Sequence, residues 1–438
     1  MSLATQLMLD ELMKKKGGSS KNVVVSPVSI SMVLNMLSSG SAGKTLDQFL
    51  EILGSGNADD LNTESSTIMR LLAPSSDGSN DTVAPPRFPS SHYKLFLDMH
   101  RIAPRTRSPM SYVSNRHRQY EEEPSIPKKP EKKGLVFNFV NALWVDHRFP
   151  LIPSFQKMAS TTYKARVENV DFEFEGERVK KAVNSWAEKE TKGLIKEIVP
   201  PESKLEPPLC LVNALYFKGD WESPFRASKT CHKDFHLLNG ETIKAPFMIK
   251  EDAYYSSYGE FKDFKLLQLP YESDQGMNKR FSMYIFLPHA KNGLEELIKK
   301  YNSDPTMLQP KRFRLQRETL SPLWIPKMKL SYDFNTKRLM KEKGLTLPFD
   351  PLDADFTEMV YSPFDNVYVG SILHKACIEV NEKGTEAAAV TVGKTYARAA
   401  QAKRECHFVA DHPFLFMIVE DSLNLIVFTG IFVNPLLD

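Results

Sequence analysis

The chain has 438 residues, of which 42% are hydrophobic and 25% charged, and its formal net charge is +3 at pH 7. These values are ordinary for a soluble globular protein, and the chain is long enough to bury a large core. The charge is too small to indicate nucleic-acid binding, and no apolar run approaches the ~20 residues of a membrane-spanning helix. We therefore expect neither nucleic acid nor a membrane among its partners.

The N-terminal segment has the pattern of an amphipathic helix, with Leu3, Leu7 and Met8 on one face. No basic leader precedes these residues, and Asp10 and Glu11 interrupt the apolar ones. A secretory signal peptide instead has a basic start followed by an unbroken apolar stretch. We expect a cytoplasmic or nucleocytoplasmic protein, although the sequence leaves extracellular release open.

The four cysteines are widely spaced, and none forms the C-x-x-C pair of a zinc or redox site. Cys210 and Cys377 lie in apolar, strand-like runs, so we expect buried free thiols, as in a reducing compartment. His232 and His236 have the spacing of two ligands on one helix face, but the residues around them alternate as in a strand. We expect no metal and no cofactor.

The first third of the chain is predicted to be helical. Apolar residues recur at helical spacing in three segments: 26–37, 45–53 and 61–72. Between the first two, Gly40 to Thr45 nearly completes a phosphate-binding loop, but the position that requires its first glycine is Ser38. The residues before it also have helical rather than strand spacing. We interpret this segment as a turn between two helices, with Gly40 and Gly43 as caps.

Residues 75–133 differ in composition from the rest of the chain. They are rich in proline, lack periodicity and contain charged clusters such as Glu121–Glu123 and Lys132-Lys133. Such a segment cannot bury enough apolar surface to fold alone, so we expect a disordered insertion. It is either a partner-binding arm, a spacer, or untranslated message read through in the gene model.

Strands are predicted to dominate from residue 135 onward. Strand-like runs lie at 135–145, 208–217, 265–269, 281–287, 324–330, 372–379, 414–419 and 423–432. Helical spacing recurs at 153–162, 177–191, 294–302 and 335–343. A helical N-terminal third followed by bunched strands favours an α+β fold over a βαβ repeat.

The stretch from Glu382 to Ala399 lies between two apolar runs, 372–380 and 408–419, that both predict strands. Read at period two, one face of it is small and uncharged: Thr385, Ala387, Ala389, Thr391, Gly393 and Thr395. A segment with such a face can enter the middle of a sheet while the charges on its other face stay in water. An alanine-rich helix turn or a solvated linker is the alternative interpretation.

Seven segments resemble the serpin family, and its plant-type branch most closely, in the family's order. They are Asn22–Ile30, Asn184–Gly193, Asn213–Trp221, Phe281–Pro288, His374–Ala389, Phe408–Phe416 and Phe428–Pro435. The resemblance implies one α+β serpin domain, residues 1–74 and 134–438, with a helical N-terminal region and large mixed sheets. Residues 75–133 would be an insertion, and residues 384–405 an exposed reactive-centre loop. We expect a monomer that is not an enzyme.

The resemblance implies suicide inhibition of a protease. The protease would attack a bait bond in the loop and form an acyl-enzyme, and the freed part of the loop would insert as a new central strand. Counting from Gly384 at the family's spacing puts the bait bond between Arg398 and Ala399. Arginine there implies a trypsin-like serine protease or an arginine-specific cysteine protease. Lys394 and residues 403–404 are fallback basic sites.

The resemblance also assigns two groups of site residues. The loop hinge comprises Glu382, Gly384, Thr385, Glu386, Ala387, Ala388 and Ala389. The shutter and breach, where the central strands part, comprise Ser26, Ser29, Asn213, Trp221 and His374. Because buried polar groups must find partners, a polar cluster that can exchange them would act as a latch. The alternatives are a satisfied core histidine at residue 374 and a simple core aromatic at residue 221.

A non-inhibitory serpin-like carrier, chaperone or storage protein would share this fold but have a hinge that cannot insert. The small face from Thr385 to Thr395 argues against that interpretation. A nucleotide-dependent enzyme built on Gly40 to Thr45 is a more distant alternative, which a nucleotide-binding assay would separate.

Deleting Ser75 to Lys132 is expected to leave the thermal unfolding midpoint and the rate of protease inhibition nearly unchanged. The composition of this segment cannot support a core, and long surface insertions add little loop-closure entropy. Scanning fluorimetry and inhibition kinetics on the shortened chain check this. A large loss in either quantity would show instead that the segment packs on the domain or docks the target.

Overall fold

The computed structural model describes residues 7–10, 12, 21–72, 136–191, 193, 195–252, 254–273, 279–303, 309–362, 367–383 and 406–437. The insertion predicted at 75–133 and the loop predicted at 384–405 lie outside these residues. So does Leu3 of the predicted N-terminal helix, while residues 7–10 are helical and bury Leu7 and Met8.

Helices form most of the N-terminal region, as predicted. In that region lie α2 (Pro27–Ser38), α3 (Gly43–Leu53) and α4 (Ala58–Leu72), and further along the described chain come α6 (Pro153–Thr162), α7 (Gly176–Glu190), α8 (Leu294–Ser303) and α9 (Thr336–Glu342). Pro27 opens α2 with a preset backbone angle, and the Ser26 hydroxyl caps it by accepting from the Ser29 amide at 3.1 Å. Every residue of α2 is buried. None of the described helices is long and apolar enough to cross a membrane.

The segment that resembles a phosphate-binding loop is a turn between α2 and α3, as predicted. A Cβ on Gly40 would lie 2.6 Å from the Met359 Cε atom, so only glycine fits there. Gly43 has a φ of 49°, which favours glycine. The cap positions are held by Ser39 and Ala42 rather than by the two glycines, which corrects that part of the interpretation.

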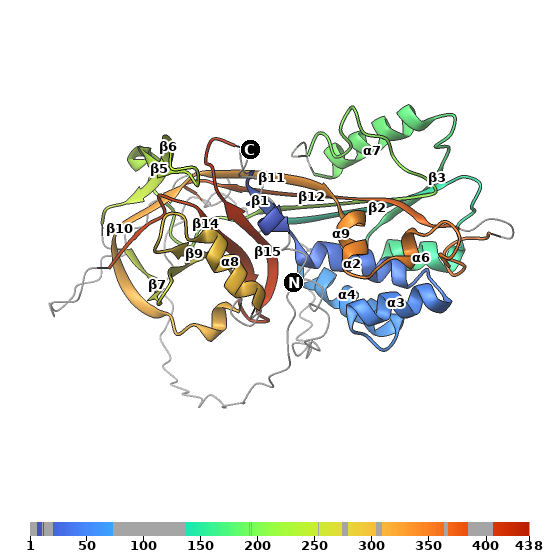
Figure 1. Cartoon of the computed structure of the whole chain (residues 1–438), viewed down its shortest axis with the longest axis horizontal. Coiled ribbons are helices and arrows are strands. Elements are labelled where there is room, and N and C mark those ends of the chain that lie inside the picture. Colours follow the sequence, from blue (N-terminus) through green and yellow to red (C-terminus); the bar gives the residue numbers. More distant parts are fainter. Residues whose placement is uncertain are drawn as a thin grey trace, which may run out of the picture.

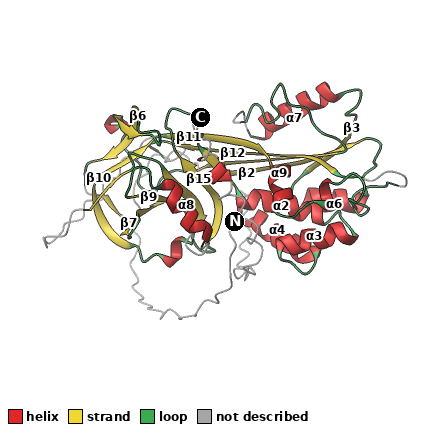
Figure 2. Cartoon of the chain, in the orientation of Figure 1, coloured by secondary structure: helices red, strands yellow, loops and turns green. Residues whose placement is uncertain are grey.

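The described strands form two sheets (Figures 1 and 2). The larger has ten strands: β1 (Val23–Val25), β15 (Leu425–Phe432), β14 (Phe414–Glu420), β9 (Phe281–Pro288), β8 (Phe264–Pro270), β7 (Tyr254–Glu260), β10 (Gln316–Pro326), β6 (Thr242–Lys250) and β5 (Cys231–His236) in spatial order, with β13 (Cys406–Val409) beside β10. The smaller sheet has five strands in the order β11 (Met328–Asn335), β12 (Val369–Val380), β4 (Leu209–Lys218), β2 (Val136–Asp146) and β3 (Arg166–Val170). Helices and large mixed sheets together confirm the α+β prediction.

Two strand predictions need correction. The run at 324–330 is not one strand, because the chain leaves β10 at Pro326 and enters β11, in the other sheet, at Met328. The run at 408–419 is divided into β13 and β14 by the segment that contains Pro413, which has no amide hydrogen to donate. The predicted list also omitted β1, β3, β6 and β7, whereas the alternation noted around His232 and His236 is the strand β5.

The five-stranded sheet has helices on both faces. Figure 1 shows α2, α3, α4 and α6 on one side of it and α7 on the other. On the α7 side a separate core includes Trp144 and Trp186, whose rings meet edge-on at 6.3 Å. Cys210 and Cys377 belong to this core and are buried free thiols, as predicted. The larger core fills the α2 side and continues into the ten-stranded sheet.

A buried polar cluster joins α2 to the middle of the five-stranded sheet. The Asn213 Oδ1 atom accepts from the Ser29 hydroxyl at 2.7 Å and lies 2.6 Å from His374 Nδ1. The Asn213 amide donates to Asn141 Oδ1 at 2.6 Å, and the Asn141 amide donates to the Tyr163 carbonyl at 3.0 Å. The cluster therefore links β12, β4 and β2 to one another and to α2.

His374 is neutral in this cluster. The Asn213 Oδ1 atom can only accept, so His374 Nδ1 carries the hydrogen of their bond. His374 is 1% exposed, and its burial lowers its pKa to about 3. The unfolded chain takes up a proton on this ring below its ordinary pKa of about 6.5, while the folded chain does not. The folded state therefore loses stability relative to the unfolded state as pH falls from about 6.5 toward 3.

Because of His374, the free energy of unfolding is expected to fall by about 2 kcal/mol between pH 7 and pH 5. The fall is about 1.4 kcal/mol per pH unit below the pKa of this histidine in the unfolded chain. His374→Gln removes the titrating group while keeping a donor for Asn213. Urea unfolding of both proteins at the two pH values measures the difference. An equal loss in the variant and the wild type would show that other groups carry the acid sensitivity.

Candidate functional site

The site centres on the pairing of β12 with β4. These two strands are parallel neighbours that pair without a shift from Ser371 opposite Cys210 to Ile378 opposite Phe217, after a bulge that follows the pairing of Val369 with Leu209. Both are almost entirely buried. The chain leaves β12 at Val380, reaches the segment 384–405 outside the described residues, and returns as β13 in the ten-stranded sheet. The predicted loop thus begins beside this pair and ends in the other sheet.

One end of the strand pair is closed by a clasp, in which residues 221–225 bind the backbone of residues 381–383. The Trp221 indole donates to the carbonyl of Asn381 at 3.0 Å, and the Trp221 amide donates to the carbonyl of Lys383 at 2.8 Å. Between them, the Phe225 amide donates to the carbonyl of Glu382 at 2.6 Å. Three consecutive carbonyls at the start of the predicted hinge are therefore occupied by one short segment.

Trp221 is fixed by stacking. Its ring lies on the ring of Tyr271 with centroids 4.4 Å apart and planes 13° apart, and Phe217 meets the same tyrosine edge-on at 4.9 Å. Trp221 is 2% exposed. It is therefore a core aromatic that also donates to the backbone at the start of the predicted hinge.

The Glu382 side chain binds two residues that lie outside the clasp. Its carboxylate accepts from the Thr230 hydroxyl at 2.7 Å and pairs with Lys327 Nζ at 3.2 Å. Burial raises the pKa of Glu382, but the hydrogen bonds to its carboxylate and the charge of Lys327 outweigh it, so the pKa lies below its ordinary value. The carboxylate is therefore charged at neutral pH.

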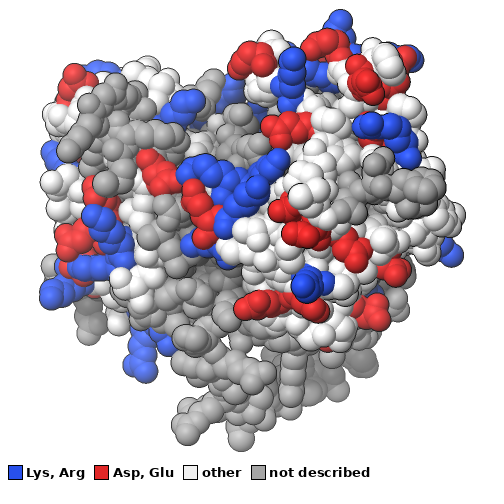
Figure 3. Space-filling view, turned by 45° about the vertical axis from the view of Figure 1, so that its right-hand side comes forward, with Lys and Arg blue, Asp and Glu red and all other residues white. Residues whose placement is uncertain are grey.

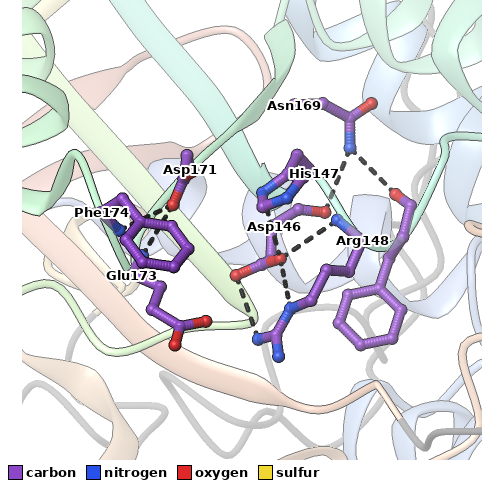
Figure 4. Close-up of polar contacts among 8 residues, drawn as sticks. Asp146, His147, Arg148, Asn169, Asp171, Glu173 and Phe174 are labelled. Atoms are coloured by element: carbon purple, nitrogen blue, oxygen red, sulfur yellow. Dashed lines mark hydrogen bonds and ion pairs between the residues drawn. The ribbon is translucent and has the colours of Figure 1, made fainter.

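The opposite end of the sheet is held by a second polar group (Figure 4). Buried Asp146, the last residue of β2, accepts from Arg148 Nε at 2.8 Å and from Arg148 Nη2 at 3.2 Å. Burial raises the pKa of Asp146, but the hydrogen bonds and charge of Arg148 outweigh it and lower the pKa below its ordinary value. The Asp146 amide donates to the carbonyl of Pro208 at 2.9 Å, which fixes the chain just before β4.

The outer face of the strand pair is crossed by the segment that follows α7. Asn184 of α7 accepts from the amides of Ile198 and Val199 at 3.0 and 2.9 Å. Lys375 of β12 donates to the carbonyl of Glu197 at 2.6 Å. These bonds hold the segment against β12.

On the face shown in Figure 3, basic side chains near the centre are bordered by acidic ones. The arrangement agrees with the small net charge of the chain. Among the described residues, no group of three histidine, cysteine, aspartate or glutamate side chains could hold a metal ion. The polar contacts between β12 and β4 at this site are hydrogen bonds of neutral groups, which could take other partners if the strands parted.

The structure brings the predicted shutter and breach residues to this strand pair. Ser29, Asn213 and His374 meet at its centre, Ser26 caps the helix that carries Ser29, and Trp221 lies at the end of the pair. Of the predicted hinge, Glu382 is described. The other hinge residues and the predicted bait bond lie outside the described residues: Gly384, Thr385, Glu386, Ala387, Ala388, Ala389, Arg398 and Ala399.

The contact residues that were not predicted from the sequence include Asn141, Tyr271, Thr230 and Lys327. Asn141 is one of two asparagines in a largely apolar strand, which is a signal that could have identified it. Tyr271, Thr230 and Lys327 have no such signal, because each reaches the site from the ten-stranded sheet or from the crossing between sheets. Only their spatial contacts reveal them.

Comparison with known proteins identifies the family. A family model described as "Serpin (serine protease inhibitor)" matches residues 2–435. The chain is 38% identical to Serpin-ZXA of Oryza sativa subsp. japonica over 96% of this chain and 92% of that one, and 37% identical to Serpin-Z10 of Arabidopsis thaliana over 95% and 92%.

A solved structure agrees with these relatives. The structure of AtSerpin1 from Arabidopsis, titled as its native stressed conformation, superposes with a TM-score of 0.75 at 34% identity and covers 99% of this chain and 96% of that one. The predicted resemblance is thereby confirmed. This chain belongs to the serpin family and is similar to plant serpins.

Proposed function

We propose that this protein traps an arginine-specific endopeptidase by cleavage of its loop and insertion of the freed segment between β12 and β4. The observation that carries the proposal is the direct parallel pairing of these strands at the point where the loop leaves the sheet. A segment that turns back from the end of β12 runs antiparallel to both strands. It can therefore bond to each of them, whereas the two strands now bond to each other.

The exchange of partners supplies the driving force. Insertion replaces one parallel interface with two antiparallel ones, and antiparallel pairing is slightly stronger per residue. About a dozen new main-chain hydrogen bonds at about 1 kcal/mol each give on the order of 10 kcal/mol. That is comparable with the stability of a whole ordinary domain. Loop insertion with release of stored strain is a recognised behaviour of serpins.

The connection of the loop explains why cleavage would be the trigger. The intact loop is anchored at one end in β12 and at the other in β13, which belongs to the ten-stranded sheet. A cut at Arg398-Ala399 releases the first part of the loop from the second anchor. The small side chains at alternate positions from Thr385 to Thr395 then fit between packed layers without burying a charge.

Serpins are typically inhibitors of proteases rather than catalysts, and the finer assignment of the target rests on Arg398. An arginine side chain pairs with the carboxylate of an acidic specificity pocket. Incubation with trypsin followed by a denaturing gel tests the function itself. A covalent band larger than either protein supports the inhibitor, and free protease with a cut loop supports the non-inhibitory alternative.

Arg398→Ala is expected to slow trypsin inhibition by roughly 100-fold or more, because a charge that pairs in the pocket is lost. Lys394→Ala is the matched control, since it removes a basic side chain from the same loop and should leave the rate nearly unchanged. Association rates are measured by progress curves with excess inhibitor. If Arg398→Ala inhibits as fast as wild type, the bait bond lies elsewhere, and residues 403–404 become the next candidates.

Thr385→Arg is expected to turn the inhibitor into a substrate. Thr385 is the first small residue after Gly384 to enter the sheet, and an unpartnered arginine buried between packed layers is strongly unfavourable. The loop should still be cut, but trypsin should go free with no covalent band. Glu386→Arg, on the opposite face of the same segment, is the control and should retain trapping. Efficient trapping by Thr385→Arg would rule out insertion through this hinge.

A further inference from the structure

Lys250, the last residue of β6, lies behind the clasp and contacts two of its residues. Its ammonium group donates to the Ser223 carbonyl at 2.7 Å and to the Ser223 hydroxyl at 2.9 Å. The same nitrogen lies 4.7 Å from the ring centroid of Phe225 and 3.7 Å from that of Tyr254. Two oxygens and two aromatic faces therefore surround one amine, and Ser223 and Phe225 both belong to the clasp.

The contacts of Lys250 persist across neutral pH. Its burial lowers its pKa to about 7, and among the described residues no carboxylate forms an ion pair with it. A neutral amine still carries two hydrogens, and Ser223 offers two acceptor oxygens. The bonds to Ser223 therefore do not depend on the charge, whereas the attraction to the rings adds to them in the charged form.

Lys250 fixes the clasp on the side away from the hinge. The exposed turn at Ser223 lies between Trp221 and Phe225, whose amides donate to the carbonyls of Lys383 and Glu382. On its other side the clasp is tied to β8 through the Glu222 amide and the carbonyl of Pro270, at 3.0 Å. Holding the Ser223 carbonyl sets the direction of the backbone on both sides of it, and therefore the alignment of both amides.

We propose that Lys250 is a positioning residue that keeps the clasp closed and thereby sets how readily β12 and β4 part at the hinge. Its effect on inhibition rests on the proposed function, but its effect on the clasp does not. Loss of its side chain loosens the turn at Ser223 and frees the hinge carbonyls. The sheet then opens more often at the point where the loop begins.

Hydrogen exchange at the Trp221 and Phe225 amides measures the clasp directly, without a protease. Lys250→Met keeps the length of the side chain and removes its donors, and should speed exchange at both amides about tenfold. Lys250→Arg keeps donors and stacks on aromatic faces, so it should restore exchange to within about twofold of wild type. Lys233→Met is the matched control, because Lys233 lies over the ring of Trp324 at 4.7 Å but does not touch the clasp.

A double-mutant cycle separates coupling through Ser223 from a general loss of packing. Ser223→Ala removes one of the two acceptors from an exposed turn and should speed exchange several-fold in the wild-type background. It should add nothing once Lys250 is Met, because the shared bond is already gone. If Lys250→Met does not fold, Ser223→Ala in the wild-type background carries the test, and unchanged exchange at both amides there overturns the proposal. Additive effects, or unchanged exchange at both amides in folded Lys250→Met, would overturn the proposal.

The rate at which stored protein loses its ability to inhibit trypsin, compared with hydrogen exchange, separates this proposal from the proposed function. In a protein that inserts its loop, Lys250→Met should lose trypsin inhibition about tenfold faster than wild type during warm storage, because its sheet opens more often. If wild type forms no covalent band but Lys250→Met speeds exchange, the proposed function fails and the role of Lys250 stands. If wild type traps trypsin but exchange is the same in both proteins, the role of Lys250 fails alone.

Discussion

The pairing of β12 with β4 is the interaction on which the rest of the structure depends. The two strands are parallel neighbours in the middle of the smaller sheet, and the loop leaves from the end of one of them. Every feature of the site acts on this pair. The Asn213 cluster holds it from the α2 side, the segment after α7 crosses it on the other side, the clasp closes one end, and Asp146 fixes the chain before β4 at the other.

These restraints are largely polar, which agrees with the proposed opening of the sheet. Hydrogen bonds contribute only about 1 kcal/mol net each, because their groups can find other partners when they separate. Apolar packing of the same strands would leave a cavity on opening, which costs more and is not recovered by exchange of partners. Asn213 and His374 can bond to a new neighbour on an inserted strand, whereas a leucine in either place could not. Because both side chains are buried without a charge, they can exchange partners inside the core. The low pKa of buried His374 also makes the folded state less stable in acid.

The topology determines which end of the loop would be released by cleavage. The loop is anchored in two different sheets, so it is constrained at both ends while intact and at one end once cut. The clasp lies at the end that stays attached, where carbonyls 381–383 are occupied by residues 221–225. In the proposed mechanism, opening of the clasp would separate the strands beside the segment that enters the sheet. Lys250 and Tyr271 support the clasp from the ten-stranded sheet, which couples the two sheets at this point.

The sequence by itself determined the α+β class, most helices and the central strands, because local periodicity and short motifs carry these features. It determined the small face from Thr385 to Thr395 in the same way. Only the tertiary structure decided the partners of Glu382, the stacking of Trp221 on Tyr271 and the position of Lys250 behind the clasp. These contacts join residues far apart in the chain, and no local pattern encodes them. The division of 324–330 between two sheets was likewise hidden, because the crossing at Lys327 follows from strand pairing rather than from the residues of the run.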